Sequence, residues 1–307
     1  MRKVLIGVLI ACLSLGLATV AFAGTEISTS GNIEFKVTGS SEAGAANGLF
    51  GAGDVLIDYN VTATSGNWKA VVSPEFDIGG GELGECDAYL QYSGGAFDLI
   101  LDPTGIDNGI FDVECAADIT LGIPSNPGVK LSVPMEGFDF YAVVNNQQDG
   151  SDVIYNFAGG VDFSMGPLGL GFTFNSNQKG VTKEDGTPLW DTASSYGAQV
   201  TYSADSLSFT GQYGGYSPEG GTGGSGYVAG IDYTLAGGSS FSLYYYGADA
   251  DLNSADGTAR TAYSKVEGSF STPLAENVSL TLTVTSTDDG SGGESVTEWE
   301  GKIGFSV

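Results

Sequence analysis

Apolar and polar residues alternate with a period of two over most of this chain. From Glu26 onward, segments of about ten residues carry apolar side chains at every second position. Near the start of this region, Ile33, Phe35 and Val37 alternate with Glu34 and Lys36. Successive side chains of a β-strand point to opposite faces, so this period predicts strands with one apolar and one polar face. The sequence therefore predicts an all-β protein.

The connections between these segments alternate strictly between short and long. Short turns are predicted at 65–66, 94–95, 135–137, 166–167, 204–205, 237–238 and 273–276. Longer polar links are predicted at about 40–53, 78–85, 102–126, 146–153, 177–192, 216–225, 248–260 and 288–294. This pattern gives about sixteen strands with both chain ends at the short-turn end. Short periplasmic turns, long external loops and an even strand number are typical of a bacterial outer-membrane barrel.

The apolar faces favour a transmembrane antiparallel β-barrel over a soluble β-sandwich. Lipid cannot satisfy free backbone groups at a sheet edge, so strands cross a membrane only in a closed barrel. Aromatic residues near the strand ends on the apolar face are expected to form interfacial girdles. These residues are Tyr59, Trp68, Tyr92, Tyr196, Tyr202, Tyr213, Tyr227, Tyr245 and Trp299. The apolar face is then expected to meet outer-membrane lipid, and the charged face to line water.

The first 23 residues have the pattern of a secretory signal peptide. Arg2 and Lys3 precede an apolar run from Val4 to about Val20, and Ala21 and Ala23 supply small residues before the expected cleavage site. A membrane-anchor helix and a lipid-modified Cys12 are the alternative interpretations. We expect residues 1–23 to be the signal peptide and residues 24–307 to be a single barrel domain. No other apolar run reaches the length of a transmembrane helix.

The composition excludes several classes of function. The chain has 37 acidic and 10 basic residues, with a net charge of -27, whereas nucleic-acid binding needs clustered Lys and Arg. It contains no histidine, which removes His-dependent catalysis and His metal ligands. We therefore expect no enzyme activity, no cofactor, no metal site and no nucleic-acid partner. The excess of carboxylates favours interaction with cations.

Three cysteines are present, and removal of the signal peptide leaves Cys86 and Cys115. An exported protein meets an oxidising compartment, so these two are expected to form a disulfide. Two separate buried thiols are the alternative. A bridge would attach the segment 102–126 to the barrel wall.

With this pattern of strands, turns and long loops, the chain resembles the general Gram-negative porins. The local match consists of 97–101, a long insertion, then 128–134 and 137–140. The resemblance implies a homotrimer of water-filled channels that pass small hydrophilic solutes by diffusion. In these porins the third long loop folds into the lumen, and 102–126 is the third long loop here. Two features depart from the family pattern: the chain ends in Val307 rather than Phe, and the mature part has one arginine, Arg260.

The segment 102–126 is the candidate pore constriction because it is long and acidic. Its carboxylates are Asp102, Asp107, Asp112, Glu114 and Asp118. Lys36, Lys69 and Lys130 are expected on the lumenal face as an opposing basic wall. Carboxylates in a pore with low-dielectric walls concentrate cations and repel anions. The sequence therefore predicts a cation-selective outer-membrane channel.

Two other functions remain open at this stage. A substrate-specific channel would need an aromatic path, for which Tyr89, Tyr141, Tyr244 and Tyr246 lie on the expected lumenal face. A secreted acidic β-rich surface or adhesive protein would show the same alternation with its apolar face turned inward. Detergent-dependent extraction would separate the second alternative from a membrane barrel.

Overall fold

The computed structural model describes residues 26–41, 48–49, 55–77, 82–106, 114–116, 119–120, 126–149, 152–177, 193–218, 223–249, 262–288 and 295–306. The strands are β1 (Glu26–Ser40), β2 (Gly48–Leu49), β3 (Val55–Ser65), β4 (Trp68–Asp77), β5 (Glu82–Ser93), β6 (Asp98–Ile106), β7 (Glu114–Ala116), β8 (Ile119–Thr120), β9 (Asn126–Met135), β10 (Phe138–Asp149), β11 (Asp152–Met165), β12 (Leu168–Asn177), β13 (Ala193–Ala204), β14 (Leu207–Pro218), β15 (Ser225–Thr234), β16 (Ser240–Ala248), β17 (Tyr263–Ala275), β18 (Val278–Asp288) and β19 (Val296–Ser306).

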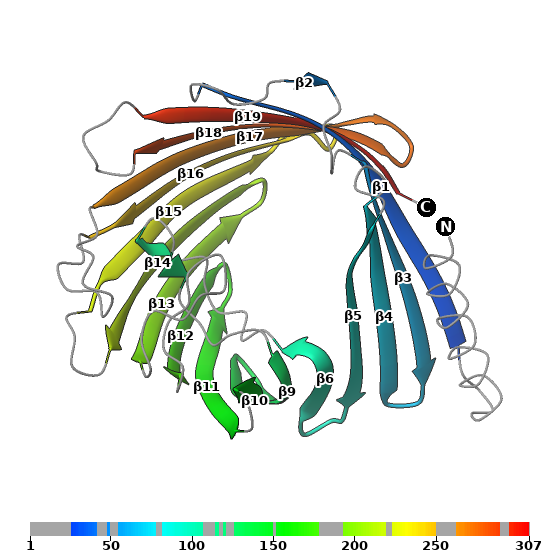
Figure 1. Cartoon of the computed structure of the whole chain (residues 1–307), viewed down its shortest axis with the longest axis vertical. Helices are drawn as coiled ribbons and strands as arrows, with labels where there is room; N and C mark the ends of the chain where they lie inside the picture. Colours follow the sequence, from blue (N-terminus) through cyan, green and yellow to red (C-terminus); the bar gives the residue numbers. More distant parts are fainter. Residues whose placement is uncertain are drawn as a thin grey trace.

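The long strands form one closed antiparallel barrel of sixteen strands (Figure 1). Each long strand pairs with its neighbours in chain order, and β1 closes the ring by pairing with both β19 and β3. The short strand β2 adds to β1, while β7 and β8 form a separate two-stranded ribbon. The prediction of an all-β antiparallel barrel with about sixteen strands is confirmed. Among the described residues, no helix is long and apolar enough to cross a membrane.

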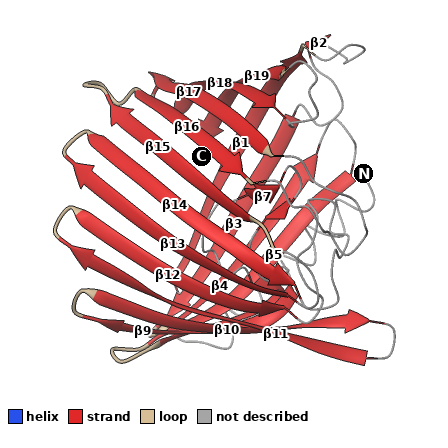
Figure 2. Cartoon of the chain, turned by 90° about the vertical axis from the view of Figure 1, so that its left-hand side faces the viewer, coloured by secondary structure: helices blue, strands red, loops and turns tan. Residues whose placement is uncertain are grey.

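The seven predicted short turns all join neighbouring strands, and they gather at one end of the barrel (Figure 2). Six of the seven, all except the turn at 94–95, contain a residue in a left-handed conformation, which glycine, Asn and Asp adopt more readily than other residues. Gly66, Gly137 and Gly166 have φ values of 58°, 79° and 57°, and Asp205 and Asn277 have φ values of 48° and 62°. The turn residues of the sequence therefore set the positions at which the chain reverses.

One of the predicted long connections is wrong. The sequence predicts a loop at 146–153, but β10 and β11 stay paired as far as Asp149 and Asp152. This hairpin extends beyond the neighbouring strands in Figure 2. The polar residues of 146–149 interrupt the apolar alternation, yet the backbone ladder continues, because cross-strand hydrogen bonds do not require an apolar face.

The cross-strand register assigns every strand an outer and a lumenal face. Paired residues share a face: the pairs Phe35–Ile303 and Ile33–Phe305 put both exposed aromatic rings on the outer face, and Glu34–Gly304 lies on the lumenal face. The girdle residues expected from the sequence all fall on the outer face by this register, and most are more than 40 % exposed. Large apolar side chains such as Phe172 and Phe174 are also exposed, at 54 % and 57 %. The described residues thus carry their apolar surface outside the ring.

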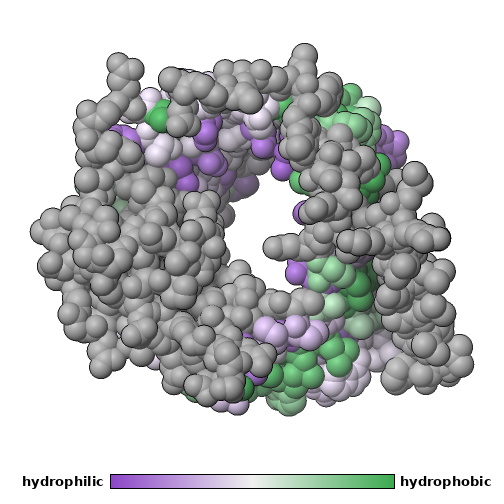
Figure 3. All heavy atoms as spheres, in the orientation of Figure 1, coloured by the Kyte–Doolittle hydropathy of each residue, from purple (hydrophilic) through white to green (hydrophobic). Residues whose placement is uncertain are grey.

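The interior of the ring is hollow. Figure 3 shows a central opening, with hydrophilic residues on part of its inner rim and hydrophobic residues farther out. This distribution is the reverse of a soluble β-sandwich, which packs its apolar faces against each other. The expected signal peptide, residues 1–23, lies outside the described residues.

Candidate functional site

The candidate functional site is the lumenal wall. Three glutamates lie on two strands of this wall that are separated by β18: Glu267 on β17, and Glu298 and Glu300 on β19. The register places Glu298 between Ser40 and Thr285, and Glu300 between Thr38 and Thr283. Each of these two carboxylates therefore has a hydroxyl-bearing residue opposite it on both neighbouring strands. We call Glu267, Glu298, Glu300 and these four hydroxyl residues the acidic arc.

The acidic arc lines a cavity of about 420 Å³ on the inside of the barrel. Glu298 is exposed, and Glu267 and Glu300 are half-buried, so water reaches this part of the wall. Hydroxyl oxygens beside carboxylates can coordinate a passing cation in place of part of its hydration shell. Within the described residues, no group of three or more His, Cys, Asp or Glu side chains is arranged to hold a metal ion. The arc is therefore a water-accessible acidic surface.

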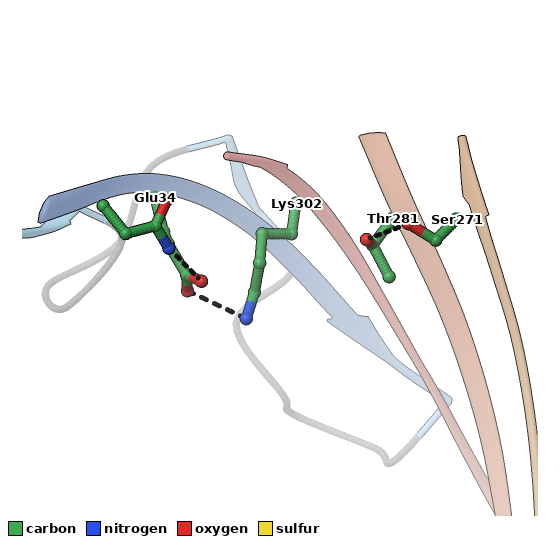
Figure 4. Close-up of polar contacts among 5 residues, drawn as sticks. Glu34, Ser271, Thr281 and Lys302 are labelled. Carbon is green, nitrogen blue, oxygen red and sulfur yellow. Dashed lines mark hydrogen bonds and ion pairs between the residues drawn. The ribbon is translucent and has the colours of Figure 1, made fainter. Parts of the chain in front are cut away.

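An ion pair lies next to the acidic arc, at the seam of the barrel. Lys302 Nζ is 2.8 Å from Glu34 Oε2, and Asn32 Nδ2 donates to Glu34 Oε1 at 2.9 Å. The residue directly opposite Glu34 on β19 is Gly304, and Lys302, two residues earlier on the same face of β19, reaches Glu34 diagonally (Figure 4). On the neighbouring strand β18, Thr281 lies opposite Lys302, and its Oγ1 donates to Ser271 Oγ of β17 at 3.1 Å.

A second part of the lumenal wall consists of uncharged polar side chains that are almost inaccessible to water. Asn145 on β10, Asn156 on β11, Asn175 on β12 and Ser195 on β13 are lumenal by register, and each is at most 2 % exposed. Asn156 Nδ2 donates to Asn145 Oδ1 at 3.1 Å, and Asn175 Nδ2 donates to Ser195 Oγ at 2.9 Å. Buried polar groups are stable only when hydrogen-bonded, and this set meets that requirement. We call these four residues the amide arc.

The three predicted basic residues lie on the lumenal face, but they do not form one cluster. Lys69 Nζ donates to the hydroxyl of Tyr89 at 3.3 Å. Lys130 Nζ lies 5.0 Å from the centre of the Tyr141 ring, within the range of a cation–π contact. Lys36 lies directly opposite Lys302 in the register. These lysines are distributed over β1, β4 and β9.

The predicted acidic constriction is described in part. Asp102 is lumenal on β6 and lies opposite Gly128. Glu114 begins β7, which lies beside β14, β15 and β16. In the order of the ring these strands are on the far side from β6. The other three carboxylates, Asp107, Asp112 and Asp118, lie outside the described residues.

The predicted disulfide is not present in the structure. Cys86 is an exposed free thiol. Its partner in the register is Pro74, which places Cys86 on the outer face with Leu90 and Tyr92. A side chain on that face points away from the lumen, so it cannot tether a segment inside the barrel. The alternative of two buried thiols is also wrong for Cys86, because this residue is exposed.

Sequence reasoning identified the lumenal acids and tyrosines but missed the amide arc and Tyr216. Tyr216 lies opposite Ser195 and is 3 % exposed. A usable signal was present: Asn145, Asn156 and Asn175 occupy polar-face positions of three successive strands. Uncharged amides at such positions, where other strands carry Asp, Glu or Lys, indicate a wall that is shielded from water.

No family model matches the sequence, and no curated protein matches it. Solved structures do match the fold. An anion-selective porin from Comamonas acidovorans superimposes with a TM-score of 0.65 at 15% identity, covering 92% of this chain and 100% of that one. The trimer form of OmpT, an outer membrane protein of Vibrio cholerae, gives 0.64 at 11% identity over 93% of this chain and 100% of that one.

Salmonella typhi OmpF, in a complex with daunomycin, gives a TM-score of 0.62 at 11% identity, covering 92% of this chain and 98% of that chain. The chain therefore has the fold of the sixteen-stranded bacterial outer-membrane porins, as the resemblance in its sequence implied. This is also the fold that the predicted location in the outer membrane requires.

Proposed function

We propose that this protein is a channel of the bacterial outer membrane, through which ions and small hydrophilic solutes diffuse passively, with a preference for cations. The observation that carries this proposal is the sorting of side chains by the register: charged and polar residues line a hollow ring whose outer face is apolar. A closed barrel with these two faces is stable in lipid and leaves an aqueous path through it.

The lipid-facing surface supports insertion into a membrane. Trp68 and Tyr92 have ring centroids 5.0 Å apart, and Tyr92 and Phe97 have centroids 5.5 Å apart, beside two of the short turns. Aromatic groups of this kind are favoured at a membrane–water interface. We further propose that residues 1–23 are a cleaved signal peptide and that the protein is a homotrimer, as the trimer form of the Vibrio cholerae protein is by its description.

The preference for cations is proposed from the charges of the lumenal face. Carboxylates outnumber lysines on this face in the described residues. The lumenal carboxylates are Glu26, Glu34, Asp58, Glu75, Asp87, Asp98, Asp102, Asp139, Asp162, Asp232, Glu267, Glu298 and Glu300, and the lysines are Lys36, Lys69, Lys130, Lys265 and Lys302. Negative charge inside low-dielectric walls raises the local concentration of cations. The anion-selective Comamonas porin has the same fold, so selectivity depends on such side chains rather than on the barrel.

We also propose that the chain between β6 and β9 narrows the channel with Asp102, Asp107, Asp112, Glu114 and Asp118. Two observations support this proposal. The ribbon strand β7 lies beside β14–β16, across the ring from β6. The amide arc is almost inaccessible to water although it lies on the lumenal side of a wall that is one sheet thick.

The decisive experiment is conductance of the purified mature protein in a planar bilayer under a salt gradient. Stepwise currents with a reversal potential that favours cations are expected. The preference should weaken as salt rises, because the screening length falls to about 3 Å at 1 M. Stepwise currents with a reversal potential that favours anions would support the channel function but contradict the proposed preference for cations. A folded protein that never produces stepwise currents would contradict the channel function itself.

A further inference from the structure

A lumenal tyrosine lies flat on the barrel wall because the residue opposite it is glycine. Tyr244 of β16 is directly opposite Gly230 of β15, and both positions face the lumen. A Cβ atom at Gly230 would lie 2.2 Å from Cε1 and 2.4 Å from Cδ1 of Tyr244. Carbon atoms in favourable contact are about 3.5–4.0 Å apart. The ring therefore occupies the space that any side chain at position 230 would need.

A hydrogen bond fixes the far end of this ring. The Tyr244 hydroxyl donates to Asp232 Oδ2 at 2.6 Å. Asp232 is two residues after Gly230 on the same face of β15, so the ring extends along that strand rather than toward the barrel axis. Beside it, the Tyr246 ring is 6.2 Å away with an interplanar angle of 28°, and Lys265 Nζ lies 4.1 Å from the centre of the Tyr246 ring.

The same arrangement recurs in the barrel. Tyr141 lies opposite Gly160 in the lumen, and on the outer face Tyr196 lies opposite Gly215 and Tyr227 opposite Gly247. In all three pairs, a Cβ atom on the glycine would lie less than 3.0 Å from the tyrosine side chain. Glycine opposite tyrosine is therefore the way in which this wall accommodates a large ring without projecting it.

We propose that Gly230 sets the width of the aqueous passage at the level of β15 and β16 by leaving room for Tyr244 to lie against the wall. This inference rests on the proposed function, because width matters only if the lumen conducts. A side chain at position 230 forces the ring to another staggered χ1 rotamer, which moves it off the wall. The displaced ring and its hydroxyl then enter the path of the solute, next to Glu267, the residue opposite Tyr244 on β17.

Gly230 is the informative member of the four pairs. The three atoms nearest to a Cβ at this position all belong to the Tyr244 ring, which can rotate. At Gly160 the Cβ would also lie 2.5 Å from the backbone oxygen of Phe172, so a substitution there disturbs the wall itself. A change at Gly230 is therefore expected to preserve the fold while it changes the passage.

The experiment compares single-channel conductance of four proteins that are refolded and inserted in the same way: wild type, Gly230→Ala, Tyr244→Ala and the double variant. Gly230→Ala is expected to lose conductance and to exclude polymers that the wild type admits. The double variant is expected to recover the conductance of Tyr244→Ala, since the ring that obstructs the passage is absent. Gly304→Ala is the matched control, because its methyl group would meet only Ser279 Oγ at 3.3 Å and Asn32 Oδ1 at 3.6 Å.

Two results would overturn the inference while leaving the channel intact: wild-type conductance in Gly230→Ala, or a double variant that conducts as poorly as Gly230→Ala alone. A crystal structure of Gly230→Ala provides a second test that does not depend on conduction. The Tyr244 ring is expected to have left the wall, and a ring still bonded to Asp232 would contradict the proposal. Absence of steps from the folded wild type would instead overturn the proposed function.

Discussion

The acidic arc and the amide arc belong to the same wall, yet they solve different physical problems. In the acidic arc the carboxylates of Glu267, Glu298 and Glu300 face a cavity and stay hydrated. In the amide arc the side chains are at most 2 % exposed, and they bond to one another instead of to water. A charge costs little where water reaches it and much where water does not. The comparison teaches that charged side chains lie where water reaches the lumenal wall, and uncharged amides lie where water is excluded.

The largest expected effect comes from breaking the amide arc. Asn156→Leu removes the 3.1 Å hydrogen bond from Asn156 Nδ2 to the buried Asn145 Oδ1. Loss of a partner at a buried polar group costs about 1–3 kcal/mol. We expect the free energy of unfolding in urea, measured in detergent, to fall by that amount.

A matched change in the water-accessible part of the wall serves as the control for Asn156→Leu. Thr281→Val removes the 3.1 Å bond to Ser271, but water can replace the lost partner there. A smaller loss of stability is expected. Equal losses in the two variants would show that the amide arc is no more shielded from water than the rest of the lumen.

A smaller effect is expected from neutralising the acidic arc with Glu298→Gln and Glu300→Gln together. A unit charge at 4 Å is worth about 1 kcal/mol to a passing ion in bulk water, so removing two charges should weaken the cation preference. The reversal potential under a salt gradient is expected to move toward zero, with little change in stability.

The control for this variant removes the same number of negative charges, but at positions away from the lumen. Asp205→Asn and Glu136→Gln remove two exposed charges at the short turns. Asp205 has φ 48°, a conformation that Asn also adopts. If the control shifts the reversal potential as much as the variant in the acidic arc does, selectivity comes from overall charge rather than from the lumenal wall.

The smallest expected effect concerns the ion pair beside the acidic arc. Lys302→Met breaks the 2.8 Å ion pair with Glu34, in which the Lys302 side chain is 28% exposed and the Glu34 side chain is 17% exposed. Pairs that water reaches contribute about 0.2–1 kcal/mol, so a loss within that range is expected in urea unfolding. Lys36→Met should show no loss, because Lys36 lies directly opposite Lys302 and like charges in that position repel. A larger loss for Lys36→Met would reverse this assignment.

Local patterns predicted most of the barrel. The period of two assigned Glu34, Lys36 and Glu298 to the lumen, and the turn residues located all seven short turns, because both signals involve neighbours in sequence. The length of the β10–β11 hairpin was missed, since polar residues can continue a ladder without an apolar signal. Burial of Asn156 was missed for a different reason: its signal is the set of uncharged amides on three successive strands, which no pattern within a single strand contains.

The same distinction explains the cysteines. The redox argument used only the number of thiols left after export, whereas a bridge also requires both side chains on the same face. The alternation already put Cys86 in phase with Leu90 and Tyr92, on the apolar side of its strand. Applying the period of two to Cys86 as well as to the charged residues would have excluded the tether to the lumen.

The seam of the barrel also dictates an order of events in folding. β1 pairs with β3 through Glu26–Phe35 and with β19 through Asn32–Ser40, so the middle of the first strand needs both neighbours. Each hairpin of adjacent strands forms from local contacts, but the seam closes a loop that spans nearly the whole chain, and such closure is entropically costly and slow. A chain that lacks the eleven residues of β19 can build hairpins and still has two open edges. Such a sheet cannot be completed in lipid, so the pairing of β19 with β1 decides whether a barrel exists at all.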